Sequence, residues 1–173
     1  MITRASIIVL LLSVVQVGRV HAQDAPGCGH GKVEFEVKTD KGPHPAKPEP
    51  GKALLYFLQD DLHFGSRPRP TTLFGIDGNW VGATHGNSYF FVYVDPGEHH
   101  LCSDWQTDVV RNYPQKRTRA ALHFTAESGK TYYFRAKDIA ITELVDAELD
   151  AMDSDEAQLM MSSFEYSSSH PKE

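Results

Sequence analysis

Short apolar and aromatic stretches recur along the middle of the chain, and residues that favour turns separate them. Ala53–Gln59 (ALLYFLQ) is apolar up to its last residue, which is typical of a central strand buried on both faces. Val33–Lys38 alternates apolar and charged residues, and this period of two indicates a strand with one buried face. No helical segment stands between successive stretches, so the pattern favours antiparallel strands.

Turn residues divide the middle of the chain into strand pairs. Asp77-Gly78 is a strong two-residue hairpin signal, and in Asp95-Pro96-Gly97 proline fixes φ while glycine accepts a positive value. The strands expected around these turns and around Glu127–Gly129 are Thr71–Ile76, Asn79–Ala83, Tyr89–Val94, Glu98–Asp104, Arg119–Ala126 and Lys130–Ala136. The sequence therefore predicts a mainly β protein, an antiparallel β-sandwich of about seven or eight strands.

The acidic C-terminal part predicts one short helix. Asp153 is a suitable N-cap, and Glu156 lies three residues later, where its side chain can bond back to the cap. Leu159 and either Met160 or Met161 are expected to pack on the sheet.

The first residues have the three zones of a cleavable export signal. Arg4 forms the positive zone, Ala5–Val17 is an apolar run, and Val20-His21-Ala22 places small residues where signal peptidase cleaves. The run is shorter than the roughly 20 apolar residues of a membrane-spanning helix, so we expect export to the periplasm or medium, cleavage near Ala22 and no membrane span. The expected organisation is a signal peptide (1–22), an N-terminal strand and proline-rich linker (23–50), a β-sandwich with its C-terminal helix (51–165) and a disordered tail (166–173).

Charge and motifs exclude several function classes. The chain has 17 basic and 23 acidic residues, and losing Arg4 and Arg19 with the signal changes the net charge from −6 to −8. An acidic protein lacks the cationic footprint that nucleic acids and anionic membranes require. The chain has no phosphate loop, no dinucleotide fingerprint and no Gly-x-Ser-x-Gly elbow, so we predict no cofactor and no enzymatic activity.

Cys28 and Cys102 are the two cysteines of the chain. In an oxidising compartment this pair favours a disulfide, which would close a loop of about 75 residues and stabilise the fold by about 4 kcal/mol. The alternative is two unpaired thiols, with Cys102 as a small core residue. Lipid attachment at Cys28 is disfavoured, because Ala25-Pro26-Gly27 precedes it and the apolar run ends well before it.

Metal sites are weakly indicated. His99 and His100 are adjacent, but neighbouring residues of a strand face opposite sides and cannot share one ion from the same face. We expect one to be hydrogen-bonded and the other solvated, and a metal-binding protein or metal-dependent enzyme using His99 or His100 stays open as the alternative function. The acidic residues of 146–155 do not fit a calcium loop, since alanine stands where glycine and glutamate are required, and we interpret them as a solvated edge.

Aromatic residues gather around the two predicted hairpins. The candidate binding residues are Trp80, Tyr89, His99, His100 and Trp105. The strand Tyr89–Val94 has apolar side chains on both faces. A strand face exposed to water normally carries polar side chains, so both faces of this strand are expected to be covered or to bind a partner. Two interpretations follow: the proline-rich segment or the helix covers the outer face, or this face binds a protein partner or a glycan.

Five motifs in order resemble a bacterial exported family, the domain of unknown function 2846. They are Pro50–Tyr56, Gly75–Gly82 (GIDGNWVG), Gly86–Phe90, Val94–Leu101 (VDPGEHHL) and Ala126–Tyr133 (AESGKTYY), and they span about residues 50 to 160. The resemblance implies a small β-sandwich similar to PEGA-type surface domains and an envelope protein without known activity. We therefore expect a non-enzymatic envelope protein that binds an unknown envelope protein or glycan, or has a structural role.

Overall fold

The protein is mainly β, as predicted, and its strands form two sheets, with one short helix on the outside of the larger sheet. The computed structural model describes residues 27–31, 33–65, 68–106, 115–141 and 144–173, so the predicted signal peptide lies outside the described residues. The strands are β1 (Phe35–Asp40), β2 (Ala53–Asp60), β3 (Thr71–Ile76), β4 (Asn79–His85), β5 (Ser88–Val94), β6 (Gly97–Trp105), β7 (Gln115–Lys116), β8 (Arg119–Ala126), β9 (Thr131–Ile141), β10 (Leu144–Met152) and β11 (Glu165–Pro171), and the helix is α1 (Ser154–Met161).

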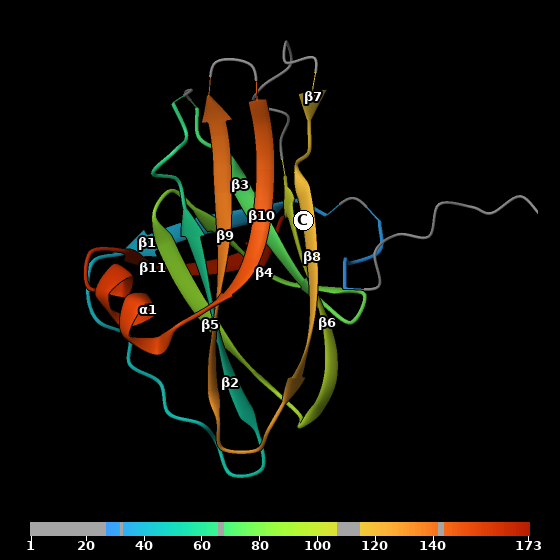
Figure 1. The fold of residues 1–173 in the computed structure, drawn as a ribbon, viewed down its shortest axis with the longest axis vertical. Helices are drawn as coiled ribbons and strands as arrows, with labels where there is room; N and C mark the ends of the chain where they lie inside the picture. Colours follow the sequence, from blue (N-terminus) through green and yellow to red (C-terminus); the bar gives the residue numbers. More distant parts are fainter. Residues whose placement is uncertain (1–26, 32, 66–67, 107–114, 142–143) are drawn as a thin grey trace, which may run out of the picture.

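A seven-stranded sheet and a four-stranded sheet make up the sandwich. The strand orders are β1-β11-β5-β2-β9-β10-β7 and β4-β3-β6-β8. The β1 and β11 strands run across the direction of the long strands β9 and β10 (Figure 1), and both contact β4 of the other sheet. Apolar side chains of both sheets, including Phe57, Phe74, Leu101 and Phe134, fill the space between the layers.

The fold is the predicted β-sandwich, and its larger sheet is mixed, with parallel pairs beside the antiparallel ones. The parallel pairs are β2 with β9, β5 with β11, and β7 with β10. A parallel pair needs a long crossover connection, which a helix usually provides. Between β2 and β9 the chain forms β3, β4, β6 and β8 of the second sheet as well as β5 and β7 of the larger one, a connection that a search for strand–helix alternation does not detect.

The C-terminal residues form a strand, so the predicted disordered tail (166–173) is also wrong. The β11 strand pairs with β1 over Phe35–Asp40 and with β5 at Glu165 and Tyr166. Its serines stabilise it through side-chain bonds: the hydroxyls of Ser167 and Ser88 lie 2.7 Å apart, and Ser169 Oγ accepts from the Ala83 N–H at 2.9 Å. The β1 strand of the N-terminal segment is likewise part of the larger sheet.

The helix begins as predicted but packs differently. Asp153 is the N-cap and its carboxylate accepts from the Asp155 N–H, whereas Glu156 pairs with Arg135 and does not bond back to the cap. Ala157 is the buried residue of α1, and Leu159 is 73% exposed, so its predicted packing is wrong. Met160 and Met161 both pack on the outer face of the larger sheet, where one of the two was predicted to pack.

Cys28 and Cys102 form a disulfide, and both are buried. The bridge joins residues 74 apart in sequence and fixes Gly27–Gly29 across the smaller sheet. Gly75 lies under this crossing, where a Cβ would collide with the Gly27 carbonyl, so only glycine fits.

We expect the double variant C28A/C102A to lose about 2–5 kcal/mol of unfolding free energy, because the open chain gains entropy when it unfolds. Urea denaturation measures this loss. Wild-type protein treated with reductant should match the variant, and an unchanged midpoint in both would show that the bridge adds nothing to stability.

Candidate functional site

The five predicted binding residues lie in separate places and do not form one site. Tyr89 is on the outer face of the larger sheet, and Trp105 is buried beside Phe64. Trp80 packs against Gly29 on the smaller sheet, and His99 and His100 lie at the far end of β6. Each location therefore has to be judged by its own contacts.

His99 is held in a hydrogen-bonded cluster that joins two turns. Its Nδ1 lies 2.6 Å from the Asp77 carboxylate and its Nε2 lies 2.8 Å from the Asp95 carbonyl. The other carboxylate oxygen of Asp77 accepts from the His100 N–H at 2.8 Å, and the Asp77 N–H donates to the His100 carbonyl. Asp77 therefore attaches the β3–β4 turn to β6.

The contacts of His99 and His100 give the metal alternative no support. Both ring nitrogens of His99 have hydrogen-bond partners, while His100 is exposed beside His123, with ring centroids 6.0 Å apart. This confirms that one histidine is hydrogen-bonded and the other solvated. Within the described ranges, no three His, Cys, Asp or Glu side chains are grouped to hold a metal ion.

The outer face of the larger sheet is covered, as the first of the two interpretations predicted. Tyr56 and Tyr89 lie at its centre, and Met160, Met161 and Phe164 pack over it from the helix side. The proline-rich strap, which we define as residues 43–50, crosses another part of this face, and its Ala46 packs in the same cluster.

The described part of the chain has no helix with the length and apolar character that a membrane crossing requires.

A cleft of about 430 Å³ remains between the strap and α1. Tyr56, Tyr89 and Tyr133 form its floor, and Gln158 and Met161 of α1 line the opposite side. Tyr56 and Tyr133 are stacked, with centroids 5.2 Å apart. Burial raises the pKa of both hydroxyls, so they are neutral hydrogen-bonding groups at physiological pH. Among the described residues, no Asp, Glu, Lys or Arg lines this tyrosine cleft.

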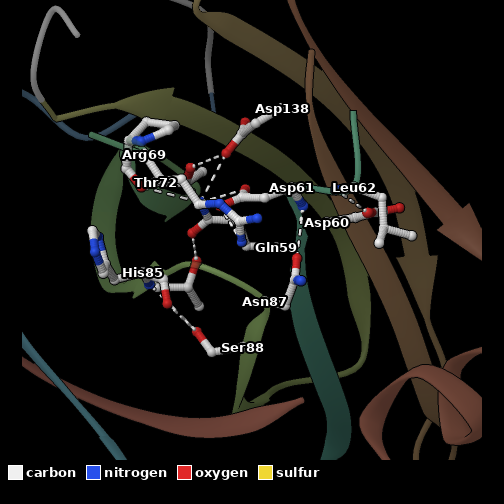
Figure 2. Close-up of polar contacts among 12 residues, drawn as sticks. Gln59, Asp60, Asp61, Leu62, Arg69, Thr72, His85, Asn87, Ser88 and Asp138 are labelled. Atoms are coloured by element: carbon white, nitrogen blue, oxygen red, sulfur yellow. Dashed lines mark hydrogen bonds and ion pairs between the residues drawn. The ribbon is translucent and has the colours of Figure 1, made fainter. Parts of the chain in front are cut away.

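A second unusual site is buried between the sheets and was not predicted. Figure 2 shows Gln59 at its centre, with Asp61, Thr72 and Asp138 around it. The Gln59 Nε2 donates to Asp61 Oδ1 at 2.8 Å and to Asp138 Oδ2 at 2.9 Å, and its Oε1 accepts from Thr84 at 2.7 Å. Asp138 also accepts from Thr72 at 2.8 Å and from the Trp105 indole at 2.7 Å.

Asp61 and Asp138 form a buried acid pair whose raised pKa values favour one shared proton. Burial and the neighbouring Asp61 carboxylate raise the pKa of Asp138 to about 8, and burial also raises the pKa of Asp61. Asp61 Oδ2 is buried without a hydrogen-bond donor, and the nearest cation, Arg69 Nη1, is 3.7 Å away. Two adjacent carboxylates in a dry site cannot both ionise, so a shared proton removes the repulsion.

The acid pair is enclosed by protein, since Asp61 and Asp138 are each 1% exposed. The Asp61 side chain exposes none of its surface, and an acid that transfers a proton must contact the reacting group. The tyrosine cleft is open to ligands and is the better candidate functional site. Its tyrosines come from the predicted strands, but of the three only Tyr89 was among the candidate binding residues, and sequence reasoning missed Tyr56 and Tyr133.

No family model, curated protein or solved structure matches this chain. The resemblance to the domain of unknown function 2846 therefore rests on the motifs of the chain alone.

We expect the D61N variant to reduce the pH dependence of stability, because it removes the carboxylate that adds to the effect of burial on the pKa of Asp138. The folded pKa of Asp138 lies above its ordinary value of 3.8, so the stabilisation from the shared proton is complete below that value and is lost as pH rises towards 8. The limiting slope for one proton is about 1.4 kcal/mol per pH unit. The asparagine introduced by D61N keeps an oxygen that can accept from Gln59. Its NH₂ group replaces Asp61 Oδ2, an oxygen that no hydrogen-bond donor contacts.

Urea denaturation between pH 5 and pH 8 measures the difference. Wild-type protein should lose stability with rising pH relative to D61N, and D155N, which alters an exposed carboxylate of α1, should follow wild type. Parallel curves for wild type and D61N would contradict the shared proton.

We expect the D77N variant to lower the pKa of His99. Burial alone lowers that pKa, but the Asp95 carbonyl and the Asp77 carboxylate together raise it above its ordinary value. The stabilisation is present below pH 6.5 and is lost as pH rises through the folded pKa. An NMR titration of the His99 ring tests this, with E98Q as the control; equal pKa values in wild type and D77N would exclude the Asp77 contribution.

Proposed function

We propose that this protein is an exported, non-enzymatic binding protein of the cell envelope, and that the tyrosine cleft is its ligand site. The observation that carries the proposal is the cleft itself, an aromatic cavity of about 430 Å³ on an otherwise covered sheet face. Its volume lies in the range of small-ligand sites, and such sites combine apolar walls with a few polar groups.

The chemistry of the lining favours a neutral ligand. The rings of Tyr56 and Tyr133 offer flat apolar surfaces, and the Gln158 amide offers a donor and an acceptor at the helix side. The Ser162 hydroxyl donates to the Leu159 carbonyl at 2.6 Å and so offers an acceptor. A charged ligand would lose its hydration without gaining an ion pair from these residues. The export signal and the disulfide support a site outside the cytoplasm.

The contacts of the titratable groups support a binding role rather than catalysis. Asp138 has the strongly raised pKa, and it is buried away from the cleft among Gln59, Thr72 and Trp105. His99 uses both ring nitrogens within its own cluster. Neither group is placed to act on a molecule bound between Tyr133 and α1.

We expect the Y133A variant to bind ligand about 10-fold more weakly than wild type, because it removes one stacking surface of the cleft. The probes are chitotetraose, a neutral sugar, and a synthetic peptide with the sequence of residues 41–51. Chemical-shift changes at Gln158 and Ser162 in two-dimensional NMR report binding.

The L159A variant is the matched control, because Leu159 lies on the same helix but is 73% exposed and lines no part of the cleft. Wild type and L159A should respond alike. A wild-type protein whose cleft signals move with neither probe would overturn the proposal.

A further inference from the structure

The strap is held by tyrosine hydroxyls that bond to its main chain. The N–H of His44 donates to the Tyr89 hydroxyl at 3.3 Å, and the N–H of Ala46 donates to the Tyr56 hydroxyl at 3.0 Å. The Tyr93 hydroxyl donates to the carbonyl of Lys47 at 3.2 Å. Three side chains of the sheet thus contact groups that any peptide backbone has.

Prolines explain why hydroxyls, and not a neighbouring strand, bind this segment. Pro43, Pro45 and Pro48 have no N–H, so the strap cannot form the ladder of an edge strand. The prolines also hold the backbone extended before binding, which lowers the entropy lost when the segment docks. The strap keeps four N–H groups, at positions 44, 46, 47 and 49, and the first two follow prolines and each donate to one tyrosine.

The side chains of the strap follow the same alternation. His44, Ala46 and Pro48 are half-buried on the sheet, whereas Pro43, Pro45 and Lys47 are exposed. The His44 ring stacks on Tyr166 with centroids 4.1 Å apart. The mode of contact is an extended proline-rich segment on an aromatic surface, which other proteins use to recognise proline-rich partners.

The strap does not fill the surface on which it lies. The tyrosine cleft continues beside it to Tyr133 and to Gln158 and Met161 of α1. At its ends, Gly42 and Gly51 have no atoms within 4 Å of the position of a Cβ. A longer proline-rich segment could use the same hydroxyls and also the rest of the cleft.

We propose that the tyrosine face binds a proline-rich segment of a partner protein, and that the strap is an intramolecular competitor for the same place. This inference rests on the proposed function and names its ligand. A peptide fits the hydroxyls better than a glycan does, because the distances from Tyr56 and Tyr89 match N–H groups separated by one proline. A tethered competitor acts at an effective concentration in the millimolar range, so the intact protein binds the partner more weakly than a protein without the strap.

The test uses the full chain with residues 43–50 replaced by a Gly-Ser linker of equal length. The probe is the peptide of residues 41–51, and the same peptide with its four prolines changed to alanine is the control ligand. We expect the proline peptide to bind this variant at least 10-fold more tightly than it binds wild type. In the same background, Y56F and Y89F should each weaken binding about 3- to 10-fold, because each removes one hydroxyl and keeps the ring.

The Y132F variant is the matched control, since the Tyr132 hydroxyl accepts from the Glu127 N–H outside the cleft. If the linker variant does not fold, A46P replaces it, because proline at position 46 removes the N–H that Tyr56 accepts and loosens the strap in place. A46P should then bind the proline peptide more tightly than wild type does.

Three results would overturn the inference. Equal binding of the proline and alanine peptides would show that proline spacing is not recognised. Chitotetraose moving the cleft signals while the peptide does not would leave the proposed function intact and reject the peptide ligand. Concentration-dependent dimers on gel filtration, lost when the strap is replaced, would assign the surface to the strap of a second copy.

Discussion

Asp138 accepts hydrogen bonds from Gln59 of its own sheet and from Thr72 and Trp105 of the other, and these bonds fix how the two layers meet at one end. Burying an ionised carboxylate costs several kcal/mol, so the site is stable only because its donors and the proton shared with Asp61 replace the lost water. The same bonds determine the register of β2 and β9, since Gln59 and Asp138 must reach each other across neighbouring strands. The central strand of the larger sheet is thereby fixed in position and orientation.

The orientation of β2 decides what lies on the outside of the molecule. Its inner residues, such as Leu55 and Phe57, join the core between the sheets, while Leu54, Tyr56 and Leu58 point outward. Tyr89 of β5 and Tyr133 of β9 extend this outer apolar face on both sides. Such a face needs a cover, and the helix and the strap divide that task.

The sequence contained the local features of this fold more completely than its long-range ones. The Asp77-Gly78 hairpin, with φ of 49° and 81°, the Asp153 cap and the disulfide could be predicted because each depends on residue types at fixed short spacing or on a single pair. The β10 strand has a period-two pattern, yet its outward acids resembled a solvated edge; they pair with Arg117 and Lys137. The buried site could not be predicted, because Gln59 and Asp138 are 79 residues apart and meet only through a parallel pairing.

One sequence signal for the buried site did exist. On β9 an apolar row is interrupted by one carboxyl group: the residues of this face are Phe134, Ala136, Asp138 and Ala140.

The helix and the strap each cover a separate part of the outer face, and this affects how the cleft can be occupied. Met160, Met161 and Phe164 stay on the sheet whether or not the strap does, because they belong to α1 and to the turn that leads into β11. A partner segment would therefore replace the contacts of the strap with Tyr56, Tyr89, Tyr93 and Tyr166, none of which lies in the buried core between the sheets.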